Sequence, residues 1–242
     1  MKKALNIILI VIVAIDFGYS QSSEELRFYD SSWERTDKLR KVFYIKNISI
    51  ENDSSYQIKV FNNSGNLMMK GYFSKLEPMI PNGYFEFYNI NTTYDKCTGY
   101  YLNGEIVGEW KIFHNDSTRI LNYDSINSTS CKELDDYDSY PDVFITYEDY
   151  ASFRGRDPGI SFREYIVEER FYPPFEELFH ITGRVIIEFI IDKNGNVCKP
   201  KIVKNISTNF DKEALRILNN SPNWDPVHRI EMFTFPFWFD YE

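Results

Sequence analysis

The C-terminal part of the chain contains, at residues 183–197, the stretch GRVIIEFIIDKNGNV. Val185 and every second residue after it, up to the turn, are apolar and point to one face, because successive side chains of a strand alternate between its two faces. The segment 192–196 is a tight turn in which Asn-Gly supplies the positive φ angles that a short hairpin needs. The sequence therefore predicts a hairpin with strands over 183–191 and 197–204.

Two helices and one more strand are predicted around this hairpin. The first helix runs over 161–169, where Ser161, followed three residues later by a glutamate, forms a capping box and a pair of prolines ends the helix. The second helix begins at Thr208 or Asn209 and carries an apolar stripe at helical spacing. The last strand runs over 230–239. This order predicts an α+β domain with two helices on one face of a three-stranded antiparallel sheet.

The region before this domain contains a weak internal repeat. Segments in which an aromatic residue precedes Asn-rich turn residues begin at Phe61, Tyr88 and Phe113, at spacings of 27 and 25 residues. Each unit predicts short aromatic strands separated by turns, in an antiparallel meander. The clearest copy, YLNGEIVGEW at residues 101–110, resembles the MORN-like repeats. The resemblance implies a binding sheet, and the alternative is a spacer whose aromatic residues form only its core.

The N-terminus has the features of an export signal. Two lysines precede an apolar run over residues 4–15, which spans roughly 18 Å as a helix and is short against the ~30 Å of a bilayer core. Small residues at Gly18 and Ser20 predict cleavage before Gln21. An uncleaved membrane anchor and a buried helix are the alternatives. Cleavage places the mature chain in an oxidising compartment, the periplasm or cell envelope.

Composition argues against several classes of function. The 242-residue chain has a net charge of −9 and no basic stripe, so it is a poor candidate for binding nucleic acid, whose phosphates need clustered Lys and Arg. Hydrophobic residues make up 43% of the chain, enough for a packed core. The sequence contains no metal-ligand spacing and no nucleophile-elbow, zinc-protease or phosphate-loop motif. We therefore expect no enzyme, no metal and no cofactor.

The three cysteines leave two alternatives open. In an oxidising compartment Cys97 pairs with Cys131, and Cys198 then remains alone. The other alternative is that the cysteines are buried thiols.

The C-terminal hundred residues resemble the TonB C-terminal domain family. Phe-Tyr-Pro at 171–173 matches the Tyr-Pro motif of the family, and residues 181–192 match its strand motif G-x-V-x-V-x-F-x-V-D. Residues 210–215, FDKEAL, match L-D-x-x-A-L, and residues 221–226, SPNWDP, match x-P-x-W-x-P. Several motifs in one order over this length make the resemblance specific. It implies a periplasmic domain that binds the receptors of the outer membrane.

The resemblance also implies where a partner binds. Family members bind a short extended peptide, the TonB box of a receptor, by β-augmentation, in which the peptide pairs with the unpaired main-chain groups of an edge strand. Pro236 removes one donor, so pairing is expected in the residues before it. These residues are Glu231, Met232, Phe233, Thr234 and Phe235. The second candidate contact segment, around Tyr-Pro, comprises Arg170, Phe171, Tyr172 and Pro173. The alternative role of Tyr172 and Pro173 is only to end a helix.

The whole sequence predicts an α+β chain in four segments: a signal peptide over 1–20, a MORN-like β-repeat region over 21–125, an acidic linker over 126–142 and a TonB-like domain over 143–242. The main functional hypothesis is a periplasmic TonB-like protein that binds receptor peptides and supports energy-dependent transport across the outer membrane, with an inner-membrane energising complex as a further partner. The alternative is a cell-envelope scaffold that works through its β-repeats. A homodimer formed by exchange of edge strands between two copies of the chain is a further alternative.

Overall fold

The computed structural model describes residues 24–52, 55–90, 94–124, 152–225 and 231–240. Its chain divides into two compact units, Met1–Asn122 and Tyr123–Glu242. The expected signal peptide at 1–20 and the expected linker at 126–142 lie outside the described residues. No helix in the described part of the chain is both long enough and apolar enough to cross a membrane.

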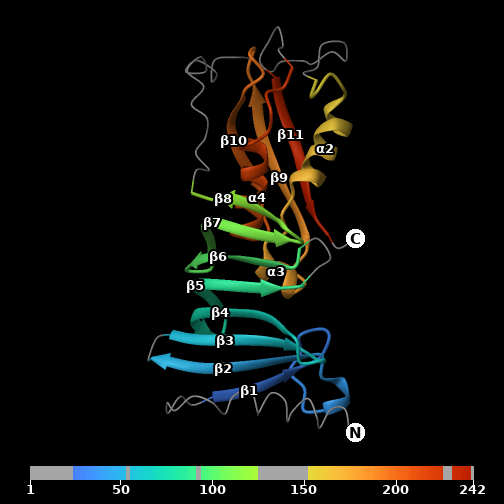
Figure 1. The fold of residues 1–242 in the computed structure, drawn as a ribbon. Coiled ribbons are helices and arrows are strands. Elements are labelled where there is room, and N and C mark those ends of the chain that lie inside the picture. Colours follow the sequence, from blue (N-terminus) through green and yellow to red (C-terminus); the bar gives the residue numbers. More distant parts are fainter. Residues whose placement is uncertain (1–23, 53–54, 91–93, 125–151, 226–230, 241–242) are drawn as a thin grey trace. The chain divides into compact units, whose positions relative to one another are not determined.

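The N-terminal unit is one eight-stranded antiparallel sheet in which each strand pairs with the next along the chain (Figure 1). This order confirms the expected antiparallel meander. A 3-10 turn, η1 (Leu39–Lys41), precedes the second strand. The strands are β1 (Glu24–Tyr29), β2 (Tyr44–Asn52), β3 (Ser55–Asn62), β4 (Leu67–Leu76), β5 (Met79–Tyr88), β6 (Lys96–Leu102), β7 (Glu105–His114) and β8 (Ser117–Asn122).

Glycines allow aromatic rings to pack directly on the backbone of this sheet. A Cβ atom on Gly71 of β4 would overlap the ring of Phe85 on β5, and one on Gly99 of β6 would overlap the indole of Trp110 on β7. Phe85 and Trp110 are fully buried. In the sequence repeat Gly71 corresponds to Gly99, and Phe85 corresponds to Trp110. The β4–β5 and β6–β7 hairpins therefore repeat one packing unit. Their likeness to MORN-like repeats stays a prediction.

The C-terminal unit is a three-stranded antiparallel sheet with helices, in the order β10-β9-β11 (Figure 1). Its α+β class is as expected, and the strands and the last helix lie within a residue of their predicted bounds. The elements are α2 (Pro158–Glu169), α3 (Pro174–Leu178), β9 (Gly183–Ile191), β10 (Val197–Lys204), α4 (Thr208–Asn219) and β11 (Glu231–Phe239).

The core of this unit lies on one face of the sheet. Phe162 of α2 and Phe210 of α4 both belong to the buried cluster that contains the inward side chains of β9 and β11, so both helices cover the same face. Trp224 packs in this cluster, as expected. Its backbone N–H donates to the Gly195 carbonyl over 2.8 Å, and a Cβ on Gly195 would overlap the backbone carbonyl of Trp224. The glycine of the hairpin turn is therefore required for packing as well as for its φ of 82°.

Two details of the predicted helices are wrong. α2 begins at Pro158 rather than at Ser161, because proline at the first position of a helix has the right φ and lacks an N–H that would be unpaired there. Ser161 is no cap, since its hydroxyl donates to the Asp157 carbonyl. A third helix, α3, was also missed: Pro173 keeps the chain extended after α2, but Pro174 opens a new helix.

Candidate docking edge

Strand β11 forms one edge of the C-terminal sheet. It pairs with β9 along its whole length, from Glu231 opposite Ile191 to Phe239 opposite Gly183, without a shift of register. No other strand in the described residues pairs with its outer side. The expectation that the last strand is an edge strand is therefore confirmed.

The opposite edge, β10, is irregular. Its pairing with β9 shifts register twice between Cys198 and Lys204. Lys199 has a φ of 47°, in the left-handed region, and Pro200 has no N–H to donate. Bulges, proline and lysine are the features by which natural sheets prevent further strands from pairing with an edge. β11 is thus the better edge for an incoming strand.

The outward main-chain groups of β11 belong to alternate residues. In an antiparallel pair every second residue directs its N–H and C=O away from the partner strand. The Trp238 carbonyl accepts a hydrogen bond of 2.8 Å from Arg170 Nη1, which lies outside the sheet, so Trp238 belongs to the outward set. Met232, Thr234 and Pro236 share its parity. Met232 and Thr234 therefore offer both an N–H and a C=O, whereas Pro236 offers only its C=O.

Alternate side chains of β11 attach the strand to the core. Phe235 and the two phenylalanines that follow at every second position are buried. On the opposite face Met232 is 44% exposed and Trp238 is 42% exposed. The Arg184 guanidinium of β9 lies 5.1 Å from the centre of the Trp238 ring, in a cation–π contact. A strand added to this edge would meet free main-chain groups and, on one face, exposed Met232 and Trp238.

The second predicted segment, Arg170–Pro173, connects α2 to α3. Phe171, Tyr172 and Pro173 are buried, and the Tyr172 hydroxyl donates to the Ile181 carbonyl. Tyr172 therefore fixes the start of β9, and Pro173 precedes the first residue of α3. Arg170 donates to the Trp238 carbonyl of β11, and the Tyr172 hydroxyl also donates, over 3.5 Å, to the carbonyl of Phe239 at the end of the strand. Contact of these four residues with a peptide stays a prediction.

A buried ion pair, absent from the sequence-based prediction, holds this segment. Both oxygens of Glu213 accept from Arg216, at 2.7 Å each, and both residues lie on α4 and are buried. Glu213 Oε1 also accepts from the Phe171 N–H at 2.8 Å, and Oε2 accepts from the Tyr123 hydroxyl at 2.7 Å. Burial opposes the charge of Arg216, but the hydrogen bonds that Arg216 donates to Glu213 and the charge of that carboxylate outweigh burial and raise the pKa of the guanidinium. The spacing of these residues on α4 was the only sequence signal.

A second buried acid, Glu176 of α3, joins α3 to the start of α4. Its Oε1 accepts from Asn209 Nδ2 at 2.7 Å and from the Ser207 hydroxyl at 3.1 Å. Its Oε2 is buried and has no hydrogen-bond partner in the described structure. Glu176 is only 3% exposed, and burial raises its pKa from 4.5 to about 7, although these hydrogen bonds act in the opposite direction. Because α3 itself was missed, this contact was not predicted from the sequence.

The expected Cys97–Cys131 disulfide is wrong. Cys97 is a fully buried thiol on β6, opposite Phe87 and Ile112 on the core face of the N-terminal sheet. Cys198, which was expected to remain alone, is disulfide-bonded. Cys131 lies outside the described residues.

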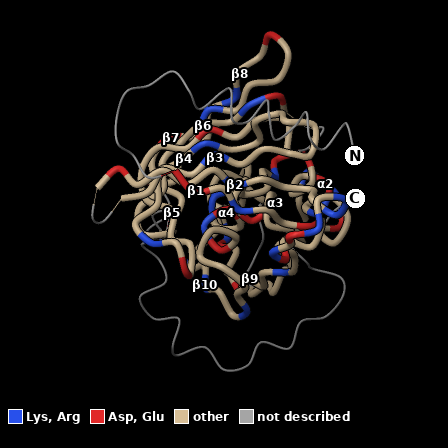
Figure 2. Tube along the Cα trace, turned by 90° about the horizontal axis from the view of Figure 1, so that it is seen from below, with Lys and Arg blue, Asp and Glu red and all other residues tan. Residues whose placement is uncertain are grey.

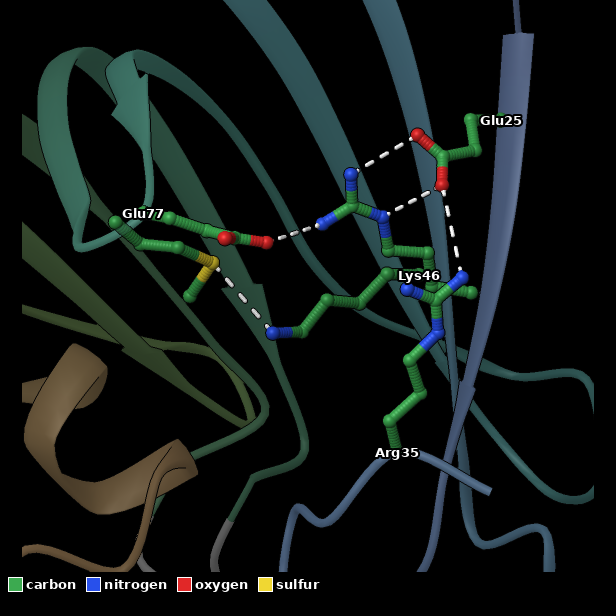
Figure 3. Close-up of polar contacts among 6 residues, drawn as sticks. Glu25, Arg35, Lys46 and Glu77 are labelled. Atoms are coloured by element: carbon green, nitrogen blue, oxygen red, sulfur yellow. Dashed lines mark hydrogen bonds and ion pairs between the residues drawn. The ribbon is translucent and has the colours of Figure 1, made fainter. Parts of the chain in front are cut away.

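A charged cluster ties the first strand of the N-terminal unit to the β4–β5 turn (Figure 3). Arg27 on β1 donates to Glu25 at 2.7 Å and to Glu77 at 3.0 Å. Lys46 on β2 lies 4.3 Å from the centre of the Tyr29 ring. Burial, with a smaller contribution from the charge of Arg27, lowers the pKa of Lys46 to about 8. These contacts fix the start of the sheet.

Charged residues of both signs are interspersed along the backbone in Figure 2. The described residues contain no group of three or more His, Cys, Asp or Glu side chains placed to hold a metal ion. The expectations of no enzyme, no cofactor and no nucleic-acid partner stay expectations.

The C-terminal unit is thus a small α+β domain with helices on one face of an antiparallel sheet and one long, regular edge strand. Residues 168–240 match the family described as the Gram-negative bacterial TonB protein C-terminal. The match runs from the end of α2 to the end of β11, and this part of the chain is a TonB C-terminal domain. Its family acts at the cell envelope in receptor-dependent transport. No curated protein and no solved structure matches the chain.

Proposed function

We propose that the chain is a non-catalytic periplasmic protein whose C-terminal domain binds an extended segment of an outer-membrane receptor along β11 and so supports energy-dependent transport. The receptor segment adds to the sheet as a fourth strand. The observation that carries this proposal is the outer side of β11, where Met232 and Thr234 offer complete pairs of main-chain groups. The irregular β10 edge offers no such run.

Main-chain pairing sets the position of the bound segment, and side chains set its selectivity. A main-chain hydrogen bond contributes only ~1 kcal/mol net, because the same groups bind water when the strand is absent. The few bonds that β11 offers would therefore give weak affinity alone. Exposed Met232 and Trp238 flank the added strand on one face and supply apolar contacts that depend on its sequence.

Proline at position 234 tests the proposal. The Thr234 N–H points away from β9, so Thr234→Pro removes a docking donor and leaves the pairing with β9 in place. We expect the affinity for synthetic peptides from the N-terminal extensions of outer-membrane receptors to fall at least about fivefold, which corresponds to one lost hydrogen bond. Fluorescence anisotropy with labelled peptides and the full chain measures this effect.

Thr234→Val is the matched control, because it keeps the N–H and removes only the exposed hydroxyl. It should bind as the wild type does. Equal binding by the proline and valine variants would show that β11 is not the docking edge. Absence of binding to peptides from every receptor of the host would refute receptor recognition by this domain.

The eight-stranded sheet is the second candidate for the region that binds a partner. Tyr100, Leu102 and Ile120 are each more than half exposed on it, and the rings of Tyr84 and Tyr100 lie 5.2 Å apart on adjacent strands. An envelope scaffold would use such a face to hold a partner. Retention of a partner by the chain after Thr234→Pro, together with its loss after Tyr100→Ser, would favour this alternative.

A further inference from the structure

We infer that Arg170 ends the docking edge, so that a visiting strand pairs with residues 231–236 of β11 and no further. This inference rests on the proposed function and adds to it the length of segment that the site admits. Its basis is the hydrogen bond from Arg170 Nη1 to the Trp238 carbonyl, which fills the last outward acceptor of β11.

The backbone around Arg170 is held firmly enough to make this contact part of the fold. The Arg170 N–H donates to the Ile166 carbonyl at 2.9 Å, in the last turn of α2. The next N–H, that of Phe171, donates to the buried carboxylate of Glu213 at 2.8 Å. Since both amides are fixed, the Arg170 side chain leaves the chain at a set position beside the end of β11.

The number of available outward donors and acceptors of β11 decreases along the strand. Met232 and Thr234 each present a donor and an acceptor, and no described side chain hydrogen-bonds to either residue. Pro236 presents an acceptor alone. At Trp238 the acceptor is already occupied by Arg170. An incoming strand thus gains two complete pairs and then one bond, and it must displace a guanidinium before it can use the N–H and C=O of Trp238. The part of β11 that stays open to pairing is residues 231–236. A peptide strand has the same rise, about 3.3 Å per residue, so a peptide of about six residues spans this part.

A nested series of peptides tests this limit on the full chain. The series starts from a six-residue receptor peptide that binds the wild type, is shortened to four residues, and is lengthened by two residues at its N-terminus or at its C-terminus. In either strand orientation, one of the two longer peptides reaches Trp238. For the wild type we expect affinity to rise from four to six residues and to stay constant for that longer peptide.

Removal of Arg170 should open the next pair of groups. In Arg170→Ala the peptide that reaches Trp238 should bind at least about fivefold more tightly than the six-residue peptide, which corresponds to at least one of the two main-chain hydrogen bonds that Trp238 then offers. The six-residue peptide should bind this variant and the wild type equally. Arg163→Ala is the matched control, since Arg163 is an exposed arginine on α2, the helix that precedes Arg170, and its loss changes the charge equally. Arg170→Gln provides a second, less disruptive variant if Arg170→Ala lowers helix content.

The outcomes separate this inference from the proposed function. If the wild type already gains affinity from the peptide that reaches Trp238, or if the Arg170 variants show no gain, Arg170 does not end the edge and docking still stands. If the Arg170 variants lose affinity for the six-residue peptide, Arg170 contacts the peptide directly and the inference is overturned. If no peptide binds the wild type, the proposed function fails and the inference fails with it.

Discussion

Replacing Glu176 by glutamine is expected to remove a pH-dependent loss of stability from the C-terminal unit. The Glu176 carboxyl is buried between α3 and the start of α4, and its Oε2 has no hydrogen-bond partner among the described residues. Burial raises its pKa to about 7, so the folded chain keeps the proton of Glu176 up to neutral pH. Glutamine has nearly the same shape as the protonated acid but cannot ionise.

The sign of the effect follows from the order of the two pKa values. The unfolded chain loses the Glu176 proton near pH 4.5, whereas the folded chain loses it near pH 7. Between these values the folded state binds more protons, so the free energy of unfolding decreases as the pH rises. Above pH 7 both states are ionised and the loss is complete. The difference between the two pKa values corresponds to about 3 kcal/mol.

Urea titrations at pH 5, 6, 7 and 8, followed by ellipticity at 222 nm, measure this loss. All α-helices among the described residues belong to the C-terminal unit, so this signal reports its unfolding. Glu176→Gln should unfold within about 1 kcal/mol of the wild type at pH 5 and should be more stable than the wild type by up to about 3 kcal/mol at pH 8. Glu168→Gln, on the exposed face of α2, should follow the wild type.

Asp211 on α4 adds a smaller effect of the same sign. Burial raises its pKa to about 6, but the carboxyl is only partly buried, so its contribution is weakened by solvent. Glu176→Gln should therefore keep a shallow slope between pH 5 and 6, which Asp211→Asn removes. A wild-type stability that does not change between pH 5 and 8, or a glutamine variant with the same slope as the wild type, would refute the reasoning.

Two further substitutions test the packing of the two units. Gly99→Ala places a methyl group where the Trp110 indole lies, and we expect a loss of about 1–3 kcal/mol in the N-terminal unit, measured as a lower urea midpoint in Trp fluorescence; an unchanged midpoint would contradict this packing. Glu213→Gln leaves the buried Arg216 without its counter-charge and should cost the C-terminal unit about 3–5 kcal/mol at 222 nm. A loss below about 1 kcal/mol would show that the ion pair is not essential.

Local sequence signals predicted most of the secondary structure of the C-terminal unit. The Asn194-Gly195 turn and the alternation around it placed both hairpin strands, and the apolar stripe at helical spacing placed α4. Such signals depend on residues a few positions apart, which are visible in the sequence. The short helix α3 was missed because its five residues carry no apolar period and follow a proline that was expected only to end α2.

The candidate site was predicted in part. The sequence located β11 and the segment Arg170–Pro173, but it could not show which of their groups are available. Phe171 and Tyr172 are buried, and Arg170 bonds to the strand itself. Glu213 was also missed as a residue that holds this segment, because Phe171 lies 42 residues before it in the chain.

By itself, the sequence determined the α+β class, the meander, the hairpin and the position of the last strand, since alternation, turn residues and helical spacing of apolar residues act between near neighbours. Only the tertiary structure decided that the β10 edge is irregular while β11 stays regular. It also decided that Arg170 reaches Trp238 and that Cys198 rather than Cys97 is disulfide-bonded. These facts depend on strand pairing and burial, which bring together residues far apart in the chain.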